Sequence, residues 1–169
     1  SYIVAGEYGN SSSAKIYLFD KNLTDDQPLW EYQFTSTYIH RIKISADGST
    51  IAVATYSPSL IMVFDVNSDS PLWSRGVNGR VSGLDISGDG KYVYYVDQLS
   101  GDNHQNLIVH SRISSSYLWS VDLGYGYQGT AFDRKSLVSV SADGQSIAVA
   151  RDDSVFLFDI DSTIPVWTY

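Results

Sequence analysis

The fold of this chain is decided by one stretch, Val63-Phe64-Asp65-Val66-Asn67-Ser68-Asp69-Ser70-Pro71-Leu72-Trp73, because the same pattern returns in each quarter of the sequence. The other copies are Leu18-Phe19-Asp20 before Trp30, Val109-His110-Ser111 before Trp119, and Leu157-Phe158-Asp159 before Trp167. The third residue of the motif stands eight positions before the tryptophan in three copies and ten positions before it in the first. All four tryptophans end such a copy, so we expect a repeat protein.

A second motif, Ser-x-Asp-Gly, lies between the tryptophans at residues 45–48, 87–90 and 141–144. Asp-Gly between β-rich runs predicts a tight hairpin, because glycine adopts positive φ without steric cost. An alternating apolar run precedes each hairpin, a more uniformly apolar run follows it, and then come the Phe-Asp strand and the Trp strand. Four strands therefore recur in a unit of about 45 residues, and no segment shows helical periodicity of useful length.

The hairpin, the apolar second strand and the third strand ending in Phe-Asp resemble the blades of WD-repeat propellers. The ending Pro71-Leu72-Trp73-Ser74 resembles the repeats of quinoprotein-type propellers. The resemblance covers essentially the whole chain and implies an all-β propeller. Phe-Asp stands where WD repeats usually have Trp-Asp, and there is no Gly-His dipeptide, so the Asp–His network of WD repeats is not expected. The quinoprotein cofactor residues have no match either, and no cofactor is predicted.

The predicted blades are four-stranded antiparallel meanders whose strands are called a, b, c and d in chain order. Strand a precedes Asp-Gly, b follows it, c ends in Phe-Asp and d contains the tryptophan. Complete blades are expected over 39–75, 81–122 and 136–169, whereas 2–34 supplies only b, c and d. This makes about three and three-quarter blades in a single segment, 1–169. We expect it to belong to a larger propeller, since a propeller of four to eight blades must close on itself.

Composition excludes several classes of function. With 169 residues, of which 43% are hydrophobic, the chain is long enough for one domain with a real core. A formal charge of −8 and a pI near 4.5 argue against nucleic acid and anionic membrane partners. There are no cysteines, which excludes disulfides and thiolate metal sites. No apolar run reaches the length of about 20 residues that membrane insertion requires.

The repeats differ in their connections, and these differences predict where the chain binds. From the Asp-Gly glycine to the end of strand c there are 17, 21 and 15 residues in successive units, and from Trp to the next such glycine there are 18, 17 and 25. Long b–c loops are expected over 7–13 and 98–105, and a long d–a loop from 123 onward. In a meander, b–c and d–a connections emerge on one side, so all insertions decorate one face.

We therefore predict an interaction surface on this face, rich in tyrosine, glycine, serine and asparagine, a mixture suited to adaptable recognition. The alternative is that these loops merely tolerate insertion. The candidate binding residues are Glu7, Tyr8, Asn10, Tyr56, Asp102, His104, Tyr125 and Tyr127.

No catalytic or metal site is predicted. His104, with Asp97 and Asp102 nearby in sequence, lacks the fixed spacing of a metal site, and His110 is interpreted as a substituted strand position. Two sequons, Asn10-Ser11-Ser12 and Asn22-Leu23-Thr24, favour an extracytoplasmic or cell-surface location only slightly.

The leading functional hypothesis is a non-enzymatic propeller that binds a protein or glycan through its long-loop face, and deletion of 124–129 should then weaken binding. One alternative is a quinoprotein-like or hydrolytic propeller enzyme. The other is a purely structural subunit of an assembly, completed by the remainder of the propeller.

Overall fold

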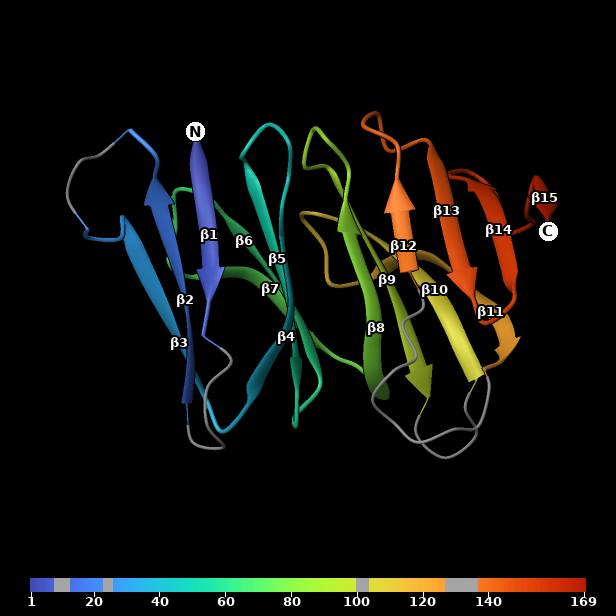
Figure 1. Ribbon diagram of the computed structural model, residues 1–169, viewed down its shortest axis with the longest axis horizontal. Coiled ribbons are helices and arrows are strands. Elements are labelled where there is room, and N and C mark those ends of the chain that lie inside the picture. The colour runs from blue at the N-terminus through green and yellow to red at the C-terminus, as the bar shows by residue number, and fades with distance from the viewer. Residues whose placement is uncertain (8–12, 23–25, 100–103, 127–136) are drawn as a thin grey trace.

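The structure, a computed structural model, describes residues 1–7, 13–22, 26–99, 104–126 and 137–169. Its regular structure within these ranges consists of strands in four separate sheets (Figure 1). The first sheet contains β1 (Tyr2–Gly6), β2 (Ser13–Asp20) and β3 (Trp30–Thr35). The second contains β4 (Tyr38–Ile44), β5 (Thr50–Tyr56), β6 (Leu60–Asp65) and β7 (Pro71–Gly76). The third contains β8 (Gly79–Ile86), β9 (Tyr92–Leu99), β10 (His104–Ser111) and β11 (Tyr117–Tyr125). The fourth contains β12 (Leu137–Val140), β13 (Ser146–Arg151), β14 (Ser154–Asp159) and β15 (Trp167–Thr168).

Each sheet is an antiparallel meander whose strands pair in chain order, and the first sheet has three strands where the others have four. This confirms the predicted fold class, with strands b, c and d alone in the first blade. The four blades stand side by side, with β1, β4, β8 and β12 nearest the viewer in Figure 1. Each of these strands contacts the next one in the series: β1 contacts β4, β4 contacts β8, and β8 contacts β12. No helix of the described residues is long and apolar enough to span a membrane.

The Ser-x-Asp-Gly hairpins are held by a small hydrogen-bond network of their own. In the second blade, Ser45 Oγ donates to Asp47 Oδ1 at 2.6 Å, and the same carboxylate oxygen accepts from the Ser49 amide at 2.9 Å. The amide of Thr50 donates back to Ser45 Oγ at 3.0 Å, and Gly48 has a φ of 74°. Equivalent bonds recur at residues 87–92 and 141–146. The motif thus closes each a–b turn by itself.

The hydrophobic cores lie between the blades rather than within them. One cluster joins the first and second sheets, one the second and third, and one the third and fourth. Strand β5, which has a blade on either side, is therefore buried on both faces along Thr50–Thr55. Strand β13 of the last sheet alternates between buried and partly exposed residues. The uniformly apolar b strands of the sequence are explained by this stacking.

The tryptophan of strand d closes each internal blade boundary in the same way. Its ring contacts the aromatic residue near the end of strand c in the next blade. The ring centroids are 6.1 Å apart for Trp30 and Phe64, 5.0 Å for Trp73 and His110, and 6.3 Å for Trp119 and Phe158; the first two pairs are stacked and the third is tilted. Its indole N–H donates to the carbonyl two residues beyond that aromatic residue, which belongs to Val66, Arg112 and Ile160 respectively. The motif Phe64-Asp65…Trp73 therefore takes part in two inter-blade contacts: Phe64 contacts Trp30 of the preceding blade, and Trp73 contacts His110 of the next.

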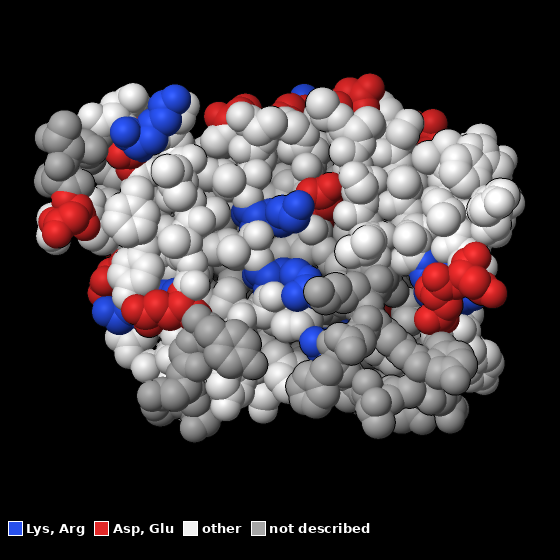
Figure 2. Space-filling model, in the orientation of Figure 1, with Lys and Arg blue, Asp and Glu red and all other residues white. Residues whose placement is uncertain are grey.

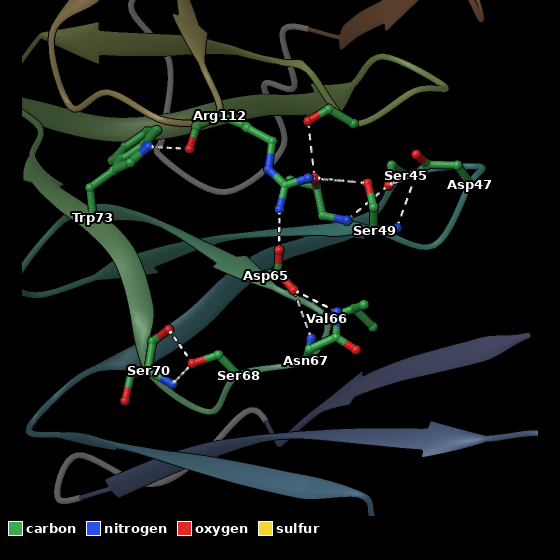
Figure 3. Close-up of polar contacts among 12 residues, drawn as sticks. Ser45, Asp47, Ser49, Asp65, Val66, Asn67, Ser68, Ser70, Trp73 and Arg112 are labelled. Atoms are coloured by element: carbon green, nitrogen blue, oxygen red, sulfur yellow. Dashed lines mark hydrogen bonds and ion pairs between the residues drawn. The ribbon is translucent and has the colours of Figure 1, made fainter.

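Figure 3 shows the middle boundary in detail. Trp73 Nε1 donates to the Arg112 carbonyl at 2.8 Å. The Arg112 guanidinium reaches back to the preceding blade, where it pairs with the Asp65 carboxylate and lies 3.5 Å from Ser49 Oγ. Asp65 also accepts from the Asn67 amide at 2.9 Å, and these contacts hold the pKa of Asp65 below its usual value against the effect of burial. Arg112 of the third blade thus contacts the second blade through both its backbone carbonyl and its guanidinium.

The strands of the third blade extend further than the sequence predicted. Gln98 and Leu99 belong to β9, His104 and Gln105 to β10, and Tyr125 to β11, although the sequence placed them in loops. Gln105 pairs with Gln98 on one side and with Gly124 on the other. Continuing the ladder satisfies backbone groups of these polar segments, which hydrophobic patterning does not reveal.

Candidate interaction surface

The b–c and d–a connections that the structure describes lie along the lower edge of the blades in Figure 1, opposite the Asp-Gly turns. We call this edge the loop face. Its described part includes residues 36–37, 57–59, 77–78 and 152–153, together with the strand ends next to them. Among the predicted binding residues, Glu7, Tyr56, His104 and Tyr125 are described, whereas Tyr8, Asn10, Asp102 and Tyr127 lie outside the described residues.

The structure brings His104 and Tyr125 together. They are cross-strand partners on β10 and β11, and their ring centroids are 3.9 Å apart at an interplanar angle of 61°. Nδ1 of His104 lies 2.8 Å from Oδ2 of Asp122, and Asp122 Oδ1 accepts from the Gly124 amide at 2.7 Å. Burial would raise the pKa of Asp122, but the Gly124 amide and His104 together bring it below its usual value. Tyr125 itself is 68% exposed. The cluster is a fixed aromatic and charged group at the edge of the blade.

Tyr56 and Glu7 lie on other blades. Tyr56 ends β5 and is half exposed, and its carbonyl accepts from Thr37 Oγ1 at 3.0 Å. Thr55 Oγ1 donates to the Pro58 carbonyl at 2.8 Å, so two threonine hydroxyls secure this short b–c turn. Glu7 follows β1 and accepts a hydrogen bond from the Tyr17 hydroxyl, which raises the pKa of Tyr17. The predicted residues are thus spread over three blades.

Sequence reasoning missed a basic cluster on the inner strands. Figure 2 shows Lys and Arg gathered at the centre of the inner face, over β4 and β8. The cluster is organised by His40, whose Nδ1 donates to the Val81 carbonyl at 2.9 Å while its Nε2 accepts from Arg80 at 2.7 Å. Arg41 donates to the His40 carbonyl at 2.9 Å, and burial and the nearby Arg80 lower the pKa of Arg41. These cations are scattered singly in the sequence, so the sequence alone does not indicate that they lie close together in the fold.

A pocket of about 270 Å³ between the second and third blades was also missed. Asp97 lines it, is only 7% exposed and has its pKa raised by burial, although Asn106 Nδ2 donates to it at 3.0 Å. Arg75 and Tyr117 also line this pocket, and the Arg75 guanidinium lies 5.1 Å from the Tyr117 ring and donates to the Ser115 carbonyl at 2.9 Å. An acid and a guanidinium in one polar recess suit a small polar group. Within the described ranges, no group of three or more His, Asp or Glu side chains is placed to hold a metal ion.

Solved structures of other proteins have a fold similar to that of this chain. No protein-family model matches the sequence, and no curated protein matches it. A chain of the crystal structure of the mitotic checkpoint complex superposes with a TM-score of 0.66 at 21% identity, covering 96% of this chain and 49% of that one. The C-terminal WD40 domain of Sif2 superposes with a TM-score of 0.67 at 13% identity, covering 99% and 45%.

This chain therefore spans about half the length of the solved structures that it matches. The resemblance to quinoprotein repeats remains a prediction. The likeness to WD40 domains agrees with the blade order, the Asp-Gly hairpins and the stacked sheets described above. The chain has the fold of WD40-type β-propeller blades.

Proposed function

We propose that this chain is a non-enzymatic interaction module that binds a protein partner through the loop face. The supporting observation is the cluster of His104, Asp122 and Tyr125. Tyr125 is 68% exposed, yet it packs on His104, which the Asp122 carboxylate holds at 2.8 Å. An exposed tyrosine that is already ordered loses little conformational entropy on binding, and tyrosines of this kind dominate many protein interfaces.

The comparison with solved structures gives this proposal a context. The mitotic checkpoint complex is by its name an assembly, and it contains a chain of the same fold. The fold alone does not assign a partner, because propellers host many unrelated activities. The choice of protein rather than glycan rests on the mixture of aromatic and charged groups at Tyr125.

The test is an affinity capture with wild-type bait and two single variants, quantified by mass spectrometry. Tyr125→Ala removes the exposed ring, and Ile113→Ala is the control, since Ile113 is 81% exposed in a c–d turn on the opposite edge. Both substitutions are on the surface, so the free energy of unfolding should change by no more than about 0.5 kcal/mol.

We expect Tyr125→Ala to deplete a defined set of captured proteins by about 30-fold, the effect of losing about 2 kcal/mol at an interface hot spot. Ile113→Ala should leave that set unchanged. If both variants capture the same proteins as the wild type, the loop-face proposal is wrong.

A further inference from the structure

The pocket between the second and third blades has one group of each charge in its walls. Among its described lining residues, Asp97 is the one acid and Arg75 is the one cation. Asp97 belongs to β9 of the third blade and Arg75 to β7 of the second, so the two charges stand on different blades. Neither takes part in an ion pair with a described residue. Each charge therefore lacks an ion-pair partner within the described part of the chain.

The carboxylate of Asp97 is in a position to receive a cation. Asp97 is only 7% exposed, and Asn106, at 3.0 Å, is the one side chain of the described ranges that donates to it. Burial of a carboxylate without a cation is costly, and burial accordingly raises the pKa of Asp97. An ammonium group in the pocket would offset this cost, because it would supply the missing opposite charge.

The guanidinium of Arg75 is fixed in place by neutral groups. It donates to the Ser115 carbonyl at 2.9 Å, and it lies 5.1 Å from the centroid of the Tyr117 ring. The Ser115 contact uses one N–H of a group that has five such donors. A guanidinium held in this way is suited to a carboxylate, which it can bind through two parallel hydrogen bonds.

The volume of the pocket limits its ligand to a small molecule. The 270 Å³ correspond to roughly nine water molecules at about 30 Å³ each, or to the non-hydrogen atoms of a mid-sized amino acid. Val77, Leu99 and Ile108 add apolar wall that a short side chain can contact. A molecule of this size that carries both an ammonium and a carboxylate group matches the two charges of the walls.

We propose that this pocket binds a free amino acid, with its ammonium group on Asp97 and its carboxylate on Arg75. Such a ligand connects the second and third blades, because it contacts a charge from each of them. It is a small zwitterion, so the proposal does not depend on a protein partner at the loop face.

The test is isothermal titration calorimetry at pH 7.5, in which each of the twenty standard L-amino acids is titrated to about 10 mM, a range that detects a Kd of about 1 mM. The amino acid that binds most tightly is then compared with two analogues, each titrated to about 100 mM. One analogue is the amine that lacks the α-carboxylate, and the other is the acid that lacks the α-ammonium group.

The variants are Asp97→Asn and Arg75→Gln, and the control is Asp69→Asn. Asp69 is exposed in the turn between β6 and β7 and does not line the pocket, so its substitution removes the same charge from another place. Far-UV circular dichroism checks that each variant keeps its β structure.

We expect at least one amino acid to bind with a Kd of about 1 mM or lower, and both analogues to bind at least about 10-fold more weakly, because each lacks one charge-assisted contact. Asp97→Asn should weaken binding of the amino acid at least about 10-fold and leave the affinity for the acid analogue unchanged. Arg75→Gln should have a similar effect on the amino acid and leave the affinity for the amine analogue unchanged. Asp69→Asn should bind as the wild type does.

The proposal is overturned if no standard amino acid binds the wild type. It is also overturned if either analogue binds as tightly as the amino acid, a comparison that needs no substitution and so does not depend on the folding of a variant. An amino acid whose affinity neither variant changes binds elsewhere on the molecule, which equally contradicts the proposal. Tyr125 does not line the pocket, so each of these results leaves the loop-face proposal standing.

Discussion

His110 offers a sharp test of how the blades pack. It occupies the position of phenylalanine in the other repeats, is fully buried, and lies between Trp73 and Tyr95 with ring centroids at 5.0 and 5.6 Å. Burial, together with the charge of Arg75, lowers the pKa of His110 from 6.5 to about 4. The folded protein therefore keeps this imidazole neutral at a pH where the unfolded chain protonates it.

The sign and size of the effect follow from this difference. Below pH 6.5 the unfolded state binds a proton that the folded state does not. The free energy of unfolding therefore decreases as the pH is lowered from 6.5 to about 4, and His110 causes no further decrease below that pH. At about 1.36 kcal/mol per pKa unit, the full loss is about 3 kcal/mol, and at pH 5 it is about 2 kcal/mol. Asp89, whose pKa is lowered to about 2, loses its stabilising effect only in more acidic solution, below about pH 4. Asp97 has a raised pKa, so its protonation favours the folded state as the pH is lowered. It is present in both the wild type and the variant described next, and it therefore does not affect their difference.

The experiment compares wild type with His110→Phe by urea unfolding at pH 7.5 and 5.0, followed by far-UV circular dichroism. The substitution restores the phenylalanine of the other repeats and removes the titrating group. We expect the wild type to lose about 2 kcal/mol more than the variant between the two pH values. Equal losses would show that His110 is not held neutral by burial and would refute the packing argument.

Three further predictions concern the blade boundaries. Trp73→Phe removes the indole N–H that the Arg112 carbonyl accepts, and it should lower the free energy of unfolding by at least about 1 kcal/mol in urea titrations, whereas Leu72→Ala should change it much less. Gly90→Ala should destabilise the fold by about 1–3 kcal/mol in thermal unfolding, because the φ of Gly90 is +68° and a Cβ there would lie 2.5 Å from Thr50 Oγ1. Gly76→Ala is the control and should be close to neutral, because the space around Gly76 is open. Equal effects of the two substitutions would contradict this prediction. Arg112→Gln should cost about 1 kcal/mol through loss of its ion pair with Asp65, and the cost should shrink in about 1 M salt; a cost that does not depend on salt would argue against the ion pair.

The sequence predicted the blade order because its two motifs each correspond to a local structure. Ser45 and Asp47 close their own hairpin, so the turn is legible without the rest of the chain. The pairing of Trp73 with His110 and Arg112 spans almost 40 residues, and nothing in one repeat reveals that its tryptophan belongs to the next. The same holds for the candidate surface. His104 and Tyr125 were both named, but their contact depends on the extended ladder of β10 and β11, which their polar composition conceals.

The location of the cores between blades has a consequence for how this sequence can change over time. Because Trp73 and His110 share one boundary, and Trp119 and Phe158 share the next, the selected unit is the junction of two repeats rather than the repeat itself. Compensating substitutions should therefore couple positions about one repeat apart, such as residues 73 and 110. Duplication or loss of a whole repeat still places each internal tryptophan beside the aromatic residue of a following repeat, although a loss brings together residues, such as Trp73 and Phe158, that were not partners before.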